Sequence, residues 1–170
     1  KNINYSPHVV ILGAGASLAT LPNGDLNKRK IPLMHNLVEI VDIEPLFIKY
    51  DYKYENENFE EVYDSLVSTN LYPGLVREIN QKIEEYFSAI ELPVAATIYD
   101  YLLLSLRKKD IIATFNWDPL LGQAFARNMD VIGYENMPEI VFLHGNVAIG
   151  FCNKCKSKGW RYNKCINCDN

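Results

Sequence analysis

The sequence predicts an α/β fold with a parallel sheet of three or more strands, a helical insertion and a small cysteine-rich module. Three short, mostly apolar segments, at 9–12, 110–114 and 140–143, are each followed within two positions by glycine or a polar residue. The 33–107 region lies between the first two segments and has apolar residues at helical spacing. All four cysteines fall in the last nineteen residues. The chain has 170 residues, of which 48% are hydrophobic, and this suffices for one domain and an appendage.

Charge and hydropathy exclude some function classes. The net charge of -4 argues against general attraction to nucleic acids or membranes. The 152–170 segment is the exception, with five Lys or Arg and one Asp, so a nucleic-acid contact there stays open. No apolar run reaches the length of about 18 residues that a membrane helix needs, and no signal sequence begins the chain. We therefore expect a cytoplasmic protein that does not contact a membrane.

The first apolar segment leads into a glycine-rich turn. Val9–Leu12 is followed by Gly13, Gly15 and Ser17, the pattern of a buried strand that turns sharply into a helix. Glycine allows unusual backbone dihedrals and close approach of a ligand, and amides at a helix start favour an anion such as phosphate. Leu18 stands where a dinucleotide motif would have its third glycine. A turn that binds nothing therefore remains an alternative.

The next segment, 21–32, contains two prolines, a glycine and the basic residues Lys28, Arg29 and Lys30. This composition predicts a mobile loop that closes over a phosphate, or equally a plain surface loop.

The insertion is predicted to be helical because its apolar residues recur every three or four positions. His35 is expected to be an ordinary surface or core histidine. The expected helices cover 33–41, 59–67, 75–90 and 94–106.

Polar side chains follow the second and third apolar segments. Asn116 and Asp118 come after 110–114, and His144 comes directly after 140–143. Because the carboxyl ends of parallel strands share one edge, where open sheets bind ligands, we expect these residues to face the glycine turn across one crevice. Capping of a helix at 119–128 is the alternative role for Asp118, and a structural role is the alternative for His144.

The cysteines form two C-x-x-C pairs separated by nine residues. Two such pairs supply the four thiolates of a tetrahedral zinc site, and disulfides are improbable in a cytoplasmic chain. A closed four-thiolate site has no open position for substrate, so the zinc is predicted to be structural. The predicted ligands are Cys152, Cys155, Cys165 and Cys168.

Taken in order, these motifs resemble the sirtuin family of NAD-dependent enzymes. The chain reads GAGAS at 13–17, T-x-N-x-D at 114–118, His144-Gly145, and C-x-x-C eight residues later with a second pair behind it. The resemblance implies a Rossmann-like sheet, here incomplete. It also implies a partial NAD-binding domain over 1–150 and a zinc-binding module over 151–170.

The resemblance also implies roles for individual residues. Asn116 and Asp118 would hold the nicotinamide ribose region, and His144 would be the general base. The residues implied in NAD binding, chiefly at its pyrophosphate, are Gly13, Ala14, Gly15, Ala16, Ser17, Thr114 and Asn116.

Departures from the family pattern favour one branch of it. Deacylating sirtuins carry a G-I-P-D-F-R-like loop that 21–32 lacks, and Phe115 and Trp117 occupy the variable positions of T-x-N-x-D. The helix-rich 44–107 region and the phrase NFEEVYDSL resemble bacterial sirtuin-like domains that hydrolyse NAD, often in defence against phage. The predicted activity is hydrolysis of NAD to nicotinamide and ADP-ribose. The alternatives are NAD-dependent lysine deacylation and a sensor that binds NAD or ADP-ribose without turnover.

Sirtuins continue beyond the second C-x-x-C with strands that complete the sheet. The resemblance therefore implies a further C-terminal domain or a partner chain, and a homo-oligomer is also expected. These 170 residues alone are expected to have little activity.

Overall fold

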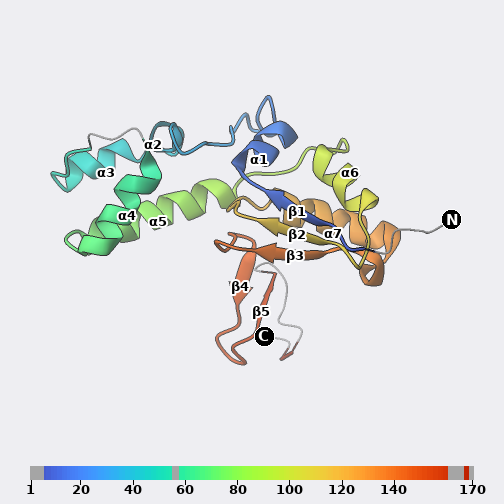
Figure 1. Cartoon of the computed structure of the whole chain (residues 1–170). Helices are drawn as coiled ribbons and strands as arrows, with labels where there is room; N and C mark the ends of the chain where they lie inside the picture. Colours follow the sequence, from blue (N-terminus) through green and yellow to red (C-terminus); the bar gives the residue numbers. More distant parts are fainter. Residues whose placement is uncertain (1–5, 55–57, 161–166, 169–170) are drawn as a thin grey trace.

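The computed structural model describes residues 6–54, 58–160 and 167–168, and it has an α/β architecture (Figure 1). Its centre is a parallel sheet in the order β1-β2-β3, formed by β1 (Val9–Leu12), β2 (Ile111–Thr114) and β3 (Glu139–Phe142). The predicted α/β class and parallel sheet are confirmed. Since all three strands run the same way, their carboxyl ends lie at one edge.

The insertion between β1 and β2 is helical, as predicted. Within the described residues it contains α2 (Leu37–Ile40), α3 (Glu44–Lys49), α4 (Phe59–Thr69), α5 (Pro73–Ser88) and α6 (Ile98–Ser105).

The predicted bounds of the first insertion helix are wrong. The helix expected at 33–41 contains only the four residues of α2, because the Asn36 side chain accepts a hydrogen bond from the Leu33 amide (2.7 Å) and holds a turn before the helix. The six-residue α3 was not predicted.

The long amphipathic helices of the insertion match their patterns more closely. Asn58 caps α4 by accepting a hydrogen bond from the Glu60 amide at 3.1 Å. The Tyr63 hydroxyl then joins α4 to α5 by donating to Asn80 at 2.7 Å. Figure 1 shows this pair to one side of the sheet, beyond the carboxyl ends of its strands.

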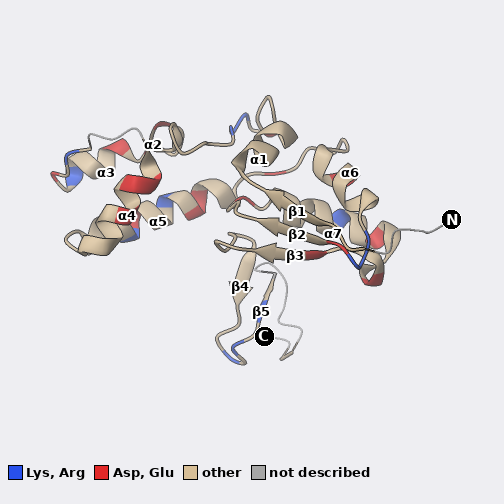
Figure 2. Cartoon of the chain, viewed as in Figure 1, with Lys and Arg blue, Asp and Glu red and all other residues tan. Residues whose placement is uncertain are grey.

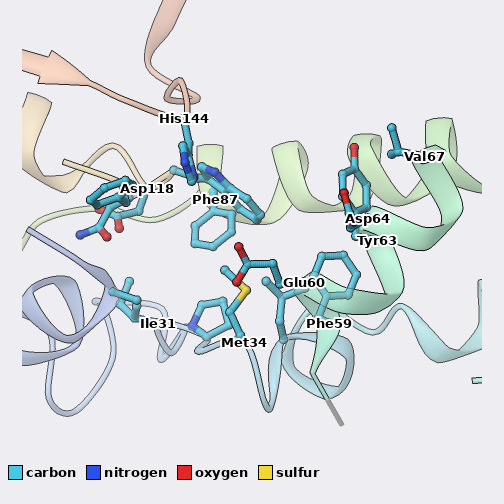
Figure 3. A pocket seen from close by; sticks show the side chains of 16 residues that line it. Ile31, Met34, Phe59, Glu60, Tyr63, Asp64, Val67, Phe87, Asp118 and His144 are labelled. Carbon is cyan, nitrogen blue, oxygen red and sulfur yellow. The ribbon is translucent and has the colours of Figure 1, made fainter. Parts of the chain in front are cut away.

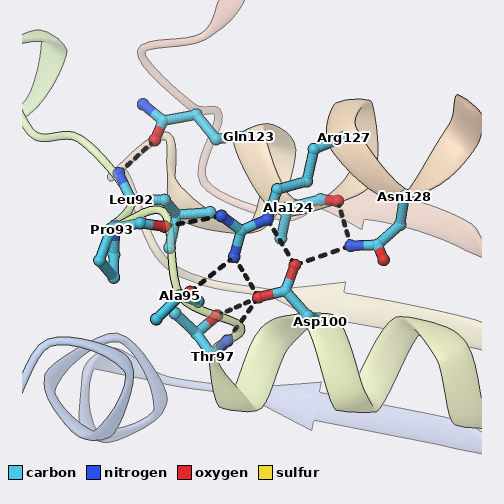
Figure 4. A network of polar contacts seen from close by, with 9 residues as sticks. All are labelled: Leu92, Pro93, Ala95, Thr97, Asp100, Gln123, Ala124, Arg127 and Asn128. Carbon is cyan, nitrogen blue, oxygen red and sulfur yellow. Dashed lines mark hydrogen bonds and ion pairs between the residues drawn. The ribbon is translucent and has the colours of Figure 1, made fainter.

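A capping box moves the start of α6 from the predicted residue 94 to Ile98 (Figure 4). The Asp100 carboxylate accepts hydrogen bonds from the Thr97 amide (2.6 Å) and hydroxyl (2.7 Å). Asp100 also pairs with Arg127 and accepts from Asn128 at 2.7 Å. Those two residues belong to α7 (Leu120–Ile132), so the network fixes α6 against α7.

The sheet is covered unequally on its two faces. Leu12, Ile112 and Thr114 point into the core and are almost fully buried. Figure 1 shows α7 behind the sheet, and α1 (Ala14–Thr20) follows β1 directly. On the opposite face Val9 is 63% exposed and Ile11 is 69% exposed. Parallel sheets are usually buried on both faces, so this open apolar face is unusual.

Asp110 fixes the amino ends of the strands. Its carboxylate accepts hydrogen bonds from the His8 and Arg107 amides, each at 2.8 Å. These hydrogen bonds lower the pKa of Asp110 to about 2.

The last described elements are β4 (Ile149–Phe151) and β5 (Lys158–Trp160), which pair as an antiparallel hairpin. The predicted domain boundary after residue 150 falls inside β4. Figure 2 shows lysine and no acidic residue on the described part of this hairpin. Among the described helices, none combines the length and apolar character needed to cross a membrane.

Candidate functional site

A cavity of about 560 Å³ lies between the carboxyl ends of the strands and the helical insertion (Figure 3). Aromatic and aliphatic side chains make up most of its wall. In Figure 3 Asp118 and His144 lie at one end, and Tyr63, Asp64 and Val67 of α4 lie at the other. The lining residues are Ala14, Ile31, Pro32, Met34, Leu37, Phe59, Glu60, Tyr63, Asp64, Val67, Phe87, Phe115, Asn116, Trp117, Asp118 and His144.

All three strand ends contribute to this cavity. Ala14 follows β1, Asn116 and Asp118 follow β2, and His144 follows β3. The structure therefore brings these sequence-predicted residues together. Within the described residues, the other candidates near the glycine turn and β2 are not among those that line the cavity. Ser17 and Thr114 are buried, and Ala16 packs against the core.

Asn116 is held firmly through its amide nitrogen. Asn116 is only 8% exposed. Its Nδ2 donates to the Gly13 carbonyl (3.0 Å) and the Ser17 hydroxyl (2.8 Å). Thr114 also contributes, because its hydroxyl accepts from the Asn116 backbone amide at 3.1 Å. These contacts join the end of β2 to the end of β1.

Asp118 contacts the start of a helix and lines the cavity. Its carboxylate accepts from the amide of Leu120, the first residue of α7, at 3.1 Å, although the N-cap position itself is Pro119. Burial raises the pKa of Asp118, while hydrogen bonds from the Ser17 hydroxyl and the Leu120 amide oppose that shift. The carboxyl group is thus deeply buried and yet directed toward the cavity.

His144 is exposed and stands on the turn after β3. Its ring lies edge-on to Phe115, with centroids 5.0 Å apart. The next residue, Gly145, has a φ of 80°, a conformation that side-chain-bearing residues rarely adopt. Gly145 is therefore required for the turn that carries the imidazole.

Asn146 connects two strand ends, a role that the sequence reasoning missed. Its Nδ2 donates to the carbonyls of Asn116 (3.1 Å) and Asp118 (2.6 Å). Its Oδ1 accepts from the Ala148 amide at 2.9 Å. In the sequence, the position of Asn146 shortly after a predicted strand was the only sign of this role.

Tyr99 is a second residue that the sequence reasoning missed. It is 1% exposed, and its hydroxyl lies 2.8 Å from the Ser17 hydroxyl and 3.2 Å from Asn116 Nδ2. Burial raises the pKa of Tyr99 to about 12. In sequence this tyrosine fits the apolar spacing of α6, so nothing indicated its polar contacts.

Within the described fold, neither Gly13 nor Gly15 occupies a position that only glycine could fill. Gly13 has φ -117° and ψ -177°, an extended conformation open to any residue, so the predicted need for unusual dihedrals is wrong there. A Cβ atom at Gly13 or Gly15 would have no heavy atom within 4 Å, apart from its immediate chain neighbours and, for Gly15, the backbone of its own helix. The turn therefore leaves open space beside the main chain.

The 21–32 loop contributes apolar residues to the cavity instead of its basic ones. Ile31 and Pro32 line the wall. Arg29 pairs with the buried Asp25 (3.2 Å) and donates to the Ala89 carbonyl (3.0 Å). Among the described lining residues there is no lysine or arginine, so the predicted basic cover over a phosphate is not found at this cavity.

Three of the predicted zinc ligands cluster. The Sγ atoms of Cys152, Cys155 and Cys168 all lie within 4.8 Å of one another. Tetrahedral zinc with Zn–S bonds of about 2.3 Å would separate its sulfurs by about 3.8 Å, so the cluster fits zinc. The Sγ atoms of Cys152 and Cys168 are 3.5 Å apart. This distance is longer than the S–S bond of about 2.05 Å, so the two residues are not joined by a disulfide. Cys165 lies outside the described residues.

Zinc is expected to bind at one ion per chain, and Cys155→Ser is expected to reduce that occupancy sharply because a thiolate ligand is lost. Metal analysis of the purified protein after gel filtration measures this directly. Ser157→Ala is the matched control because Ser157 lies beside Cys155 (3.0 Å) but outside the thiol cluster. Equal zinc content in wild type and Cys155→Ser would contradict the assignment.

No protein-family model matches this chain, and no curated protein matches it either.

Proposed function

We propose that this chain is a sirtuin-like NAD-binding domain that hydrolyses NAD to nicotinamide and ADP-ribose. One observation carries the proposal: Asn116, Asp118 and His144, from the ends of two parallel strands, line one cavity together with Ala14 at the end of the third strand. Ligands of open α/β sheets bind at that edge. The identity of the ligand as NAD comes from the motif resemblance, which also predicts a role in phage defence.

The charge of the cavity favours one orientation of NAD. Its acidic and basic lining residues are Glu60, Asp64, Asp118 and His144, so three carboxyl groups face the space. Carboxylates repel a diphosphate and attract the cationic nicotinamide ring of NAD. The nicotinamide end therefore belongs in the cavity, and the diphosphate belongs beside Gly13 and Gly15, where the main chain has open space.

The residues at the strand ends suit cleavage of the N-glycosidic bond. In this step the bond between C1′ of the ribose and the nicotinamide nitrogen breaks, and its electron pair leaves with nicotinamide. Asp118, when ionised, stabilises the positive charge that develops on the ribose. Asn116 orients the ribose or the incoming water through its amide.

Water completes the reaction by forming the new bond to C1′. His144 accepts the proton that this water loses, and imidazole is the side-chain base whose ordinary pKa lies closest to neutrality. The products are nicotinamide, ADP-ribose and one proton.

The test is incubation of the full-length protein with NAD, with chromatographic measurement of nicotinamide and ADP-ribose. Equal amounts of both products, formed without any peptide, support hydrolysis. NAD binding without product would favour a sensor and contradict the proposal.

Gly15→Ala distinguishes an effect on NAD binding from an effect on folding stability. Alanine in α1 is expected to leave stability unchanged or raise it by up to about 1 kcal/mol, because glycine is a poor helix former. The added methyl group takes space assigned to the diphosphate, so NAD affinity should fall about tenfold or more, equivalent to about 1.4 kcal/mol. Calorimetric titration and thermal unfolding measure the two effects.

Gly159→Ala is the matched control, because a Cβ there also has no neighbour within 4 Å and the residue lies in the hairpin. Unchanged NAD affinity in Gly15→Ala would argue against the assigned place of the diphosphate.

Lysine deacylation is a second candidate because the cavity extends along α4 as far as Tyr63 and Val67, whose side chains an acyl chain could contact. An acyl-lysine peptide that accelerates nicotinamide release would favour deacylation. Release that is independent of peptide would favour hydrolysis.

A further inference from the structure

We propose that Tyr99 is a positioning residue that fixes the Asn116 amide with Oδ1 available to the cavity. Its effect on catalysis rests on the proposed hydrolase function. Its effect on the orientation of Asn116 does not, and this difference allows the two to be tested separately.

The argument starts from the partners of Asn116. Nδ2 lies within hydrogen-bonding distance of three oxygens, on Gly13 (3.0 Å), Ser17 (2.8 Å) and Tyr99 (3.2 Å). The Gly13 carbonyl can only accept, so an amide flipped by 180° would place two oxygens against each other. The bonded orientation uses the nitrogen on the buried side and leaves Oδ1 for the cavity that Asn116 lines.

The directions of the neighbouring hydrogen bonds agree with this orientation. When Asp118 is ionised its carboxylate can only accept, so the Ser17 hydroxyl then donates its one proton to Asp118. The Ser17 oxygen must then accept from both Tyr99 and Asn116. The raised pKa of Tyr99 keeps its hydroxyl protonated and able to donate. The two Nδ2 protons of Asn116 then go to the Gly13 carbonyl and the Ser17 oxygen. Tyr99 therefore acts on Asn116 through the Ser17 hydroxyl, which it contacts at 2.8 Å.

The backbone around Tyr99 is itself fixed. The residue lies between Thr97 and Asp100, which form the capping box at the start of α6. Asp100 in turn pairs with Arg127 of α7. Tyr99 is therefore held by two helices, so its hydroxyl is a fixed partner for the polar side chains beside it.

Tyr99→Phe tests the inference because it removes the hydroxyl and keeps the buried ring. In the active enzyme kcat is expected to fall about 10- to 100-fold, because misplacement of a reacting group is costly. KM is expected to change less than about threefold, since the hydroxyl does not touch substrate. Tyr101→Phe, on the same helix but 62% exposed, is the matched control and should leave both constants unchanged.

A second measurement does not require activity. The side-chain amide protons of Asn116, assigned by their loss in Asn116→Asp, are expected to be shifted and slow to exchange in wild-type NMR spectra. Tyr99→Phe should shift them back toward ordinary asparagine values and speed their exchange, while Tyr101→Phe should not. Unchanged Asn116 amide signals in Tyr99→Phe would overturn the inference, whatever the rates show.

The remaining outcomes are also decisive. If the wild type releases no nicotinamide, the proposed function fails, and the NMR comparison still decides the role of Tyr99. If Tyr99→Phe does not fold, the NMR spectrum of the wild-type protein tests the inference instead. It must then contain a cross-peak between the Tyr99 ring protons and the Asn116 side-chain amide, and the absence of that cross-peak would refute the assignment.

Discussion

Alanine at Asn116 or at His144 is expected to lower the rate of nicotinamide release by about 100-fold or more. For His144 the reason is loss of the proton acceptor, since general base catalysis typically contributes factors of about 10² to 10⁴. For Asn116 the reason is loss of a fixed dipole at the reacting ribose, an effect of about 10² or more. Steady-state kinetics with saturating NAD measures both effects.

The two substitutions differ in what else they disturb. His144 is exposed, so its removal should leave thermal unfolding unchanged, and His35→Ala, at another exposed histidine, is the matched control for activity. Asn116 is buried and hydrogen-bonded, so Asn116→Asp supplements Asn116→Ala as a variant of nearly the same volume. Wild-type rates in His144→Ala would remove the imidazole from the mechanism.

Asp100→Ala is expected to destabilise the fold by about 3 kcal/mol or more, the effect of breaking a largely buried ion pair. The Asp100 side chain is 5% exposed, and its carboxylate accepts from Thr97, Arg127 and Asn128 (Figure 4). Without it, the guanidinium of Arg127 loses its counter-ion and α6 loses its cap. Chemical denaturation measures the free energy of unfolding, and Asp130→Ala, at an exposed acid of α7, is the control.

The same pair predicts a dependence on pH. The hydrogen bonds from Arg127, Thr97 and Asn128 hold the pKa of Asp100 far below the ordinary value of 3.8, against the opposing effect of burial. The stability that the folded carboxylate provides is therefore complete above about pH 5, and it is lost as the pH falls through 3.8 toward the lower pKa of the folded state. Asp100→Ala should show a flatter acid unfolding curve than wild type. Parallel curves would show that Asp100 contributes no stability through its charge.

Local sequence patterns were enough to predict the sheet and its polar edge. Val9–Leu12 and 110–114 are short apolar runs that end in glycine or polar residues, and such patterns report strands and their ends directly. Helix ends were harder to predict. The start of α6 depends on hydrogen bonds within a capping box, and α3 is too short to show a clear period.

The polar network behind the cavity could not be predicted in the same way. Ser17 and Tyr99 are 82 positions apart and meet only when α6 packs against α1. Tyr99 also satisfies the apolar pattern of its helix, so its sequence context favours a plain core residue. Long-range partners of this kind depend on the finished packing, whereas strands and turns depend on neighbouring residues.

Asn146 connects the C-terminal hairpin to the carboxyl edge of the sheet by hydrogen bonds. One amide side chain braces the backbone that carries Asn116 and Asp118, and three residues later β4 begins. Ala148, next to that strand, is itself buried. The hairpin therefore helps to support the backbone that lines the cavity. A change in the positions of its cysteines could reach Asn116 and Asp118 through the few residues between β4 and Asn146.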